Sequence, residues 1–509
     1  MTVEDRACVA LLFCATFGVG SMSFGSVFAA AGPLLASLSI YFLSACNLHA
    51  SVAVSKAMNV VPMSVRTFSD LGYFAFGEPG RRVILLSEAG VCFLNPIAFL
   101  ILGGTILLPY LFEGTVHTAT EWILMMALGV LPIVLIPTLK GAAPLCFLGC
   151  ATAIITDLIC IGYSLSSVKF SPRETQVEPN HAVQTFGTIM FAMGTAIIIP
   201  PIQRQHTEPS RLANLVSLTL LFITSIYLLI GIITYYQFGC TAPATLLDQL
   251  PPSQWRQLAA GLMFVHVLIA FPVLLNPTLF DLERFVLGKD GDIEVLRQSI
   301  ALRQAKISAD GKPILGGGSS SSTPSLASLD ADAFLYGSSA TPYFQHRSPT
   351  TGSGGGGEGH SSTTPATGSP VFHEDVTFTV RDRICSSLIR TLTVGLQTFL
   401  AVMLQSSFMD ILSLIGSTAI TISCMIMPCL CYLKVHPIST VSFAGQCDKA
   451  LCYVIIFVSS ALGVYCTVIA AGNIHNNIAK YHLFLPANVT VAASAADDQY
   501  PFCHLGERN

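Results

Sequence analysis

Long apolar runs, separated by short polar segments, follow one another along most of the chain. Each run is long enough for a helix to cross the roughly 30 Å hydrocarbon core of a bilayer, which takes about 20 residues. A membrane β-barrel would instead show strict alternation over segments of about 10 residues. The pattern predicts an all-α polytopic protein of the lipid bilayer with about 11 transmembrane helices. The expected spans are residues 8–31, 33–55, 83–111, 121–139, 142–165, 183–203, 212–237, 257–283, 386–406, 408–433 and 449–471.

The segment between the eighth and ninth expected spans has a different composition. Glycine runs at 316–318 and 354–357 are surrounded by serine, threonine and proline, and such a sequence cannot bury a core. We expect residues 290–380 to be a disordered, Gly/Ser-rich cytosolic insert, either a regulatory or docking segment or a tolerated linker. The predicted division of the chain is helices 1–8 in 1–289, the insert in 290–380, helices 9–11 in 381–472 and an extracytosolic C-terminal tail in 473–509.

Basic residues are divided unequally between the two sides of the expected bundle. With the N-terminus in the cytosol, 20 of the 25 Lys and Arg residues fall on the cytosolic side, as the positive-inside rule requires. An odd number of spans then places the C-terminal tail outside the cell or in a lumen. Asn488 begins a glycosylation sequon in that tail. Cys240 and Cys503 lie on the same side, where a disulfide between them is one possibility.

Composition supports the membrane class and argues against several others. The chain is 52% hydrophobic and 11% charged, with mean hydropathy +0.65, whereas a soluble domain carries roughly 25% charged residues. The sequence shows no nucleophile–base constellation, no metal-ligand spacing and no basic stripe with interleaved aromatic residues. It therefore predicts neither an enzyme nor a metal or other cofactor site, and no nucleic-acid partner.

Glycines interrupt the first apolar run near its middle. Residues 18–32 read GVGSMSFGSVFAAAG, and glycines in this number are costly within a helix. In lipid, a backbone group released from a helix must find a partner inside the protein, so an interrupted helix is tolerated where it is buried or lines a cavity. Transporters use such breaks to present backbone groups to substrates and ions. Close packing against another helix is the alternative explanation for these small residues.

Four segments, within residues 18–32, 191–209, 68–77 and 390–416, together resemble the amino acid/auxin permease family. The first resembles that family's first-helix signature and the second its sixth helix, whereas the other two are weaker matches. Gly25 stands where the family has proline, and Thr195 stands where many members have glycine. The resemblance covers about residues 8–470 apart from the insert. It is carried by Gly18, Gly20, Met22, Phe24, Phe28, Ala31 and Gly32, by 191–203 with Pro209, by 68–72 with Phe76 and Gly77, and by Arg390 and Thr391 with 412–416.

The resemblance implies a fold and a substrate class. The fold is a leucine-transporter-type 5+5 inverted repeat with broken helices 1 and 6, and the substrate is an amino acid. The N-terminal end of a half-helix offers N–H groups and a positive dipole end to a carboxylate, and free carbonyls suit an ammonium group. We expect the carboxylate at Gly18, Val19, Gly20 and Ser21, and the ammonium at Phe191, Ala192, Met193, Gly194 and Thr195, with Asn95 and Phe99 of the third span as further contacts. Asn95 has an interhelical hydrogen bond as an alternative role.

Three titratable residues inside the expected spans are candidates for carrying a coupling proton: Glu88, Asp157 and His266. For Glu88 the alternative is a carboxylate paired with Arg82 near the membrane face, and for His266 it is an ordinary buried histidine. A sodium site is less favoured, because the eighth span has no hydroxyl between Gln257 and Pro277.

These features together predict a secondary active amino acid transporter that works by alternating access as a proton-coupled symporter. Its expected location is the plasma membrane or a vacuolar/lysosomal membrane. The alternatives are a transporter of another small organic solute, such as an auxin-like acid, and an amino acid sensor with little flux.

Overall fold

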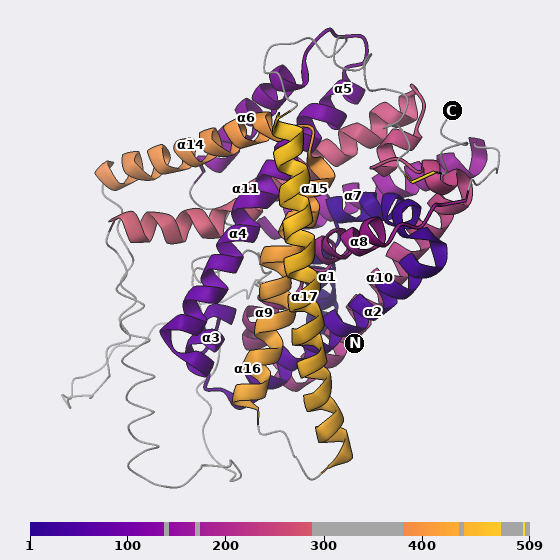
Figure 1. The fold of residues 1–509 in the computed structure, drawn as a ribbon. Helices are drawn as coiled ribbons and strands as arrows, with labels where there is room; N and C mark the ends of the chain where they lie inside the picture. The colour runs from indigo at the N-terminus through magenta and orange to yellow at the C-terminus, as the bar shows by residue number, and fades with distance from the viewer. Residues whose placement is uncertain (137–141, 168–173, 288–379, 437–441, 480–501, 504–509) are drawn as a thin grey trace, which may run out of the picture.

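The computed structural model describes residues 1–136, 142–167, 174–287, 380–436, 442–479 and 502–503, and these are almost entirely helical (Figure 1). All but the last residue of the expected insert 290–380, and the sequon at Asn488, lie outside the described residues. The α-helices are α1 (Val3–Thr16), α2 (Phe24–Val60), α3 (Phe68–Phe76), α4 (Glu78–Leu102), α5 (Leu108–Leu111), α6 (Ala119–Val134), α7 (Ala142–Ser167), α8 (Pro179–Phe191), α9 (Ile199–Gln205), α10 (Leu212–Phe238), α11 (Gln254–Leu287), α14 (Val380–Met403), α15 (Phe408–Ile415), α16 (Met427–Val435) and α17 (Phe443–Ala479).

Short 3-10 and π segments join or interrupt these helices. The 3-10 segments are η1 (Val19–Ser23), η3 (Ala196–Ile198), η4 (Pro209–Arg211), η5 (Gly239–Thr241) and η6 (Leu246–Gln249). The π segments are η2 (Gly103–Leu107), η7 (Gly416–Ile420) and η8 (Ile422–Ile426). The π segments widen a helix without ending it, so α4 continues through η2 into α5, and α15 continues through η7 and η8 into α16.

The membrane class predicted from the sequence is confirmed. Within the described parts of the chain, nine helical segments are long and apolar enough to cross a membrane, and α6 is a shorter apolar helix. One of the nine, Val19–Val60, contains Gly32 at φ 74°, in the left-handed region that favours glycine. Gly32 is the point at which one expected span ends and the next begins. The count of 11, the 5+5 repeat and the orientation in the membrane stay predictions.

Helix beginnings follow the local sequence. Thr67 and Thr118 each precede a helix and close a capping box with the acidic residue three positions later. Thr2 and Asp5 do the same for α1, where the Thr2 N–H donates to Asp5 Oδ2 at 2.7 Å. This hydrogen bond, with help from Arg211, holds the pKa of Asp5 below its usual range. Asp5 at the start of α1 therefore stays ionised and pairs with Arg211, the residue before α10.

Close approaches between backbones position α8 in the bundle. A methyl group at Gly416 in η7 would collide with the carbonyl oxygen of Gly187 in α8. A methyl at Gly187 would in turn collide with Ser413 in α15. Because only glycine permits these contacts, α8 lies directly against the α15–η7 segment. Helix α17, yellow in Figure 1, runs along the length of the bundle.

A buried ion pair joins α14, α11 and α6. Arg390 is 1% exposed, and its Nε lies 2.7 Å from Glu283 Oε1. The guanidinium also donates to the Val134 carbonyl oxygen at 2.7 Å and to Asn276 Oδ1 at 2.9 Å. The Ser386 hydroxyl donates to the same carboxylate at 2.8 Å. A charged group with this many partners can remain buried, so Arg390 acts as a structural crosslink between three helices.

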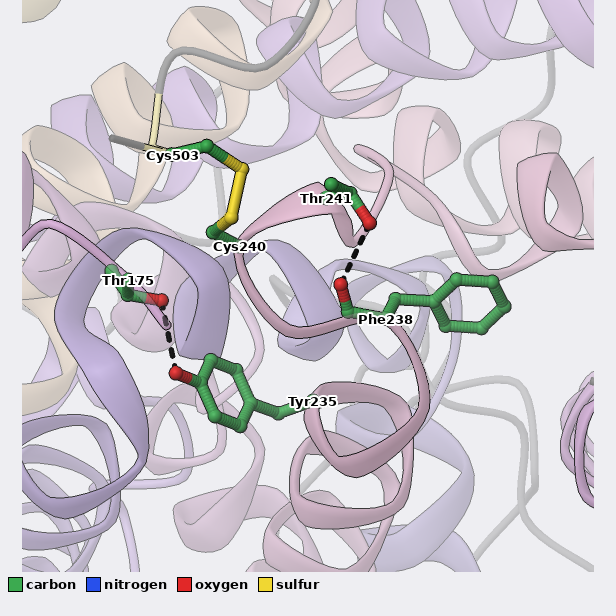
Figure 2. Close-up of a disulfide and its surroundings, with 6 residues drawn as sticks. All are labelled: Thr175, Tyr235, Phe238, Cys240, Thr241 and Cys503. Carbon is green, nitrogen blue, oxygen red and sulfur yellow. Dashed lines mark hydrogen bonds between the residues drawn. A yellow bond between two sulfur atoms is a disulfide. The ribbon is translucent and has the colours of Figure 1, made fainter. Parts of the chain in front are cut away.

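A disulfide ties the end of the chain to the loop that follows α10, as Figure 2 shows. The bond joins Cys240 in η5 to Cys503. Beside it, the Gln176 N–H donates to the Phe502 carbonyl oxygen at 2.9 Å, and Thr175 forms a β-bridge with Cys503. The pairing left open by the sequence is therefore present in the structure.

We expect Cys240→Ser and Cys503→Ser to destabilise the protein equally, by roughly 2–4 kcal/mol, because each removes the same loop closure. For the same reason the double variant should lose no more stability than either single variant. Thermal unfolding of the detergent-solubilised protein measures both effects. Cys447→Ser, which replaces an exposed free cysteine, is the control. If the double variant lost the sum of the two single-variant stability losses, the disulfide between Cys240 and Cys503 would be contradicted.

Candidate functional site at two helix breaks

The first break separates α1 from α2. Helix α1 ends at Thr16, and Phe17 is extended, with φ −90° and ψ 123°. The chain then makes the short 3-10 turn η1, all of whose residues are buried, before α2 begins at Phe24. The Ser21 N–H donates to the Gly18 carbonyl oxygen at 3.0 Å within this turn. The predicted interruption of the first span is confirmed, and it covers residues 17–23.

The second break separates α8 from α9. Helix α8 ends at Phe191, and a turn through Ala192 and Met193 leads into η3. Helix α9 then begins at Ile199, with Pro200 in its first turn. Proline lacks an N–H and is favoured at that position, so it starts a new helix here more readily than it continues an old one. The predicted interruption of the sixth span is confirmed as well.

The two breaks face each other. The hydroxyl oxygens of Thr16 and Thr195 lie 3.0 Å apart. A Cβ atom at Gly20 would lie 2.9 Å from the Ala192 Cβ and 3.0 Å from its Cα. The absence of a side chain at Gly20 therefore lets the η1 backbone rest directly on the turn after α8. Residues 18–21 and 191–195, predicted to form one site, are brought together in this way.

Side chains from two other helices hold the broken ends. The Tyr227 hydroxyl of α10 is 3.1 Å from both the Thr16 and the Ala192 carbonyl oxygens. The Asn47 Nδ2 group of α2 donates to the Met193 carbonyl oxygen at 3.0 Å. These carbonyls lie at the C-terminal ends of α1 and α8, where each helix carries the negative end of its dipole. The junction is therefore electronegative and suits a cation or an ammonium group.

A cavity of about 10 Å³ opens at this junction, which is about the space that one water molecule requires. It is too small for an amino acid, so the cavity must enlarge before a substrate of that size can enter. The polar side chains that line it come from α1, α2 and α10: Thr16, Ser44, Asn47, Thr224 and Tyr227.

Asp157 of α7 reaches the first break. It is 3% exposed, and its Oδ2 accepts a hydrogen bond from the Ser21 hydroxyl at 2.6 Å. Among the described residues, its Oδ1 atom has no hydrogen-bond partner. The same hydroxyl lies 2.9 Å from the Gly18 carbonyl oxygen, so its single proton has two competing acceptors. A change of charge on Asp157 would therefore act directly on the backbone of the break.

His266 of α11 reaches the beginning of the same break. Its Nδ1 lies 2.9 Å from the Gly149 carbonyl oxygen, and because a carbonyl only accepts, Nδ1 carries the proton. The Nε2 atom faces Gly18, where an added Cβ would lie 2.9 Å from it. Two of the three predicted proton carriers thus contact the broken segment, one near each end of it.

The remaining predicted residues lie on α4. Glu88 is buried there, within electrostatic reach of the Cys424 thiol of η8. Asn95 and Phe99 are buried two and three turns further along. In the described part of the chain, the side-chain hydrogen bonds to the backbone carbonyls of the turn after α8 come from Asn47 and Tyr227 and not from Asn95. The roles of these three α4 residues stay predictions.

Sequence reasoning missed Thr16, Asn47 and Tyr227. Asn47 carried a usable signal, because an amide in the middle of an apolar span is costly unless it has a partner. Tyr227 carried none, since an aromatic residue within an apolar run is typical of helix packing. Its function depends on two carbonyls that lie far from it in the sequence.

Comparison with known proteins identifies related sequences. The family model described as "Transmembrane amino acid transporter protein" matches residues 5–471. The Arabidopsis thaliana protein "Amino acid transporter AVT3B" is 25% identical over 301 residues, which are 54% of this chain and 70% of that protein. "Amino acid transporter AVT1J" of the same organism is 21% identical over 271 residues, 51% of this chain and 63% of that protein. "Vacuolar amino acid transporter 3" of Schizosaccharomyces pombe is 24% identical over 105 residues, 21% of this chain and 16% of that protein.

Solved structures of other proteins are also similar. The structure of MhsT in complex with L-phenylalanine covers 91% of this chain and 98% of its own, with 13% identity and a TM-score of 0.39. The structure of a manganese transporter from Eremococcus coleocola covers 96% of this chain and 94% of its own, with 11% identity and a TM-score of 0.40.

Proposed function

Because the chain belongs to the transmembrane amino acid transporter protein family, we propose that it is a secondary active transporter that moves amino acids by alternating access. The observation that carries this proposal is the meeting of two broken spans in the interior of the bundle. The C-terminal ends of α1 and α8 meet there, and in this proposal their carbonyl oxygens bind the substrate ammonium. In this proposal the N–H groups of Val19 and Gly20, at the start of η1, bind the carboxylate.

Asp157 is the proton carrier in this proposal, and the transport is symport with a proton. A buried carboxylate without a cationic partner is costly, so Asp157 holds a proton while the site is closed to water. When water reaches it from one side, the proton leaves and the carboxylate draws the Ser21 hydroxyl more strongly. The Gly18 carbonyl then loses its share of that hydroxyl, and the backbone of the break rearranges.

Asp157→Asn is expected to abolish the stimulation of uptake by an inwardly directed proton gradient. The amide keeps an acceptor for Ser21 but cannot release a proton, so exchange of internal for external amino acid should continue. Uptake and exchange of labelled amino acids in proteoliposomes separate these two activities. Wild-type uptake should rise as the external pH falls and should not change when sodium is replaced by choline.

His266→Gln and Glu88→Gln are the matched comparisons, because each also replaces a titratable group by an amide. If gradient-driven uptake survives in Asp157→Asn but is lost in His266→Gln, His266 and not Asp157 carries the proton. A strict sodium requirement would contradict proton coupling altogether. Binding of amino acids by the wild type without any uptake would indicate a sensor instead of a transporter.

A further inference from the structure

Tyr227 lies between the two breaks and is completely buried. Its ring stacks on Phe24, which begins α2, with centroids 4.3 Å apart, and on Phe17, which follows α1, at 5.8 Å. These contacts hold the ring against both ends of the first break, which restricts the position of the hydroxyl. The hydroxyl oxygen is 3.1 Å from each of the Thr16 and Ala192 carbonyl oxygens.

The chemistry of the hydroxyl explains why a tyrosine is useful there. The two carbonyls are at or beside the last residues of two helices, and both dipoles point their negative ends at the same spot. Two such ends repel each other when they approach in a medium of low dielectric constant. A hydroxyl proton placed between them is attracted to both, and it offsets that repulsion. The approach of α1 to α8 therefore depends on the Tyr227 proton.

The two helices joined by Tyr227 belong to opposite faces of the bundle. Helix α10 spans from one face to the other. At its beginning Arg211 pairs with Asp5 of α1, at 3.4 Å. At its end Tyr235 accepts a hydrogen bond from Thr175, just before α8, at 3.1 Å, as Figure 2 shows. Tyr227 lies between these two contacts, where the half-helices from the two faces meet.

We propose that Tyr227 is a positioning residue that makes the two half-helices move as one unit during transport. This inference rests on the proposed alternating access, in which the substrate site opens to one face and then to the other. The shared hydrogen bond holds the inner ends of α1 and α8 at constant spacing, so opening of one face is transmitted to the other. The Thr16–Thr195 contact supports the same spacing with a second hydroxyl pair.

Tyr227→Phe tests this role, because it keeps both ring contacts and removes only the hydroxyl. The turnover rate at saturating amino acid is expected to fall about tenfold, the cost of one buried hydrogen bond, while KM changes by less than about threefold. Tyr236→Phe, on the same helix but 62% exposed, is the matched control and should leave both parameters unchanged. A variant that raises KM alone would make Tyr227 a substrate contact and overturn the proposal.

A second measurement does not depend on transport. Amide hydrogen exchange at residues 17–23 and 192–198 should speed by about tenfold in Tyr227→Phe, because both breaks lose a common partner. Thr195→Val, which removes the other hydroxyl contact, should show a smaller increase at the same amides, and Thr195→Ser should restore the wild-type rate. Unchanged exchange in Tyr227→Phe would overturn the proposal. If the wild type shows no uptake, the proposed function fails, but the exchange result still decides whether Tyr227 joins the two breaks.

Discussion

Gly20→Leu is expected to abolish amino acid uptake and to leave the protein in the membrane. Even a methyl group at Gly20 would lie 2.9 Å from the Ala192 Cβ and 3.0 Å from its Cα, and the backbone of Ala192 cannot rotate away as a long side chain can. The added isobutyl group would force the two breaks apart and fill the space proposed for the substrate. Uptake by proteoliposomes and surface labelling of the expressed protein measure the two parts of this prediction.

Gly162→Leu is the control for this substitution. It introduces the same side chain into the transmembrane helix α7, at a position where an added Cβ meets nothing within 4 Å. Gly20→Ala should give an intermediate loss, since a single methyl requires a smaller displacement. Normal uptake by Gly20→Leu would show that the two breaks do not form the substrate site.

Arg390→Met is expected to cause the largest loss of stability, about 3–5 kcal/mol, since it leaves the buried Glu283 carboxylate without its cation. The Ser386 hydroxyl alone cannot replace a guanidinium that also bonds Val134 and Asn276. The double variant Arg390→Met/Glu283→Leu should recover most of the loss, because it removes both charges from the interior. The midpoint of thermal unfolding in detergent measures these changes.

Arg82→Met supplies the comparison for Arg390. Arg82 also pairs with a glutamate, Glu78, but its side chain is 72% exposed, and exposed pairs contribute little to stability. The unfolding midpoint of Arg82→Met should therefore match that of the wild type. An equally stable Arg390→Met would mean that the buried pair is not a crosslink between α6, α11 and α14.

The local features of the site were readable from the sequence. The glycines at 18 and 20 predicted a break in the first span, and the resemblance of residues 191–203 to a known family implied a break in the sixth. Both breaks occur within a few residues of the expected places. Such features are accessible because they depend on the backbone preferences of single residues and on the length of an apolar run.

The partners at the site were not readable in the same way. Asp157, Glu88 and His266 were all candidates as titratable residues of apolar spans, and packing distinguished them by placing Asp157 on Ser21 and His266 beside Gly18. From the sequence, a disulfide between Cys240 and Cys503 was one possibility. The tertiary structure decides it, because Cys503 lies against the loop after α10.

The sequence by itself determined that this is a helical membrane protein with interrupted spans, because lipid imposes a local rule on every apolar run. Only the tertiary structure decided which side chains meet at the interruptions. Tyr227 contacts Thr16 across most of the first half of the chain, and nothing in an apolar run specifies such a neighbour. The pairing arises from helix packing, which brings together atoms that no local pattern connects.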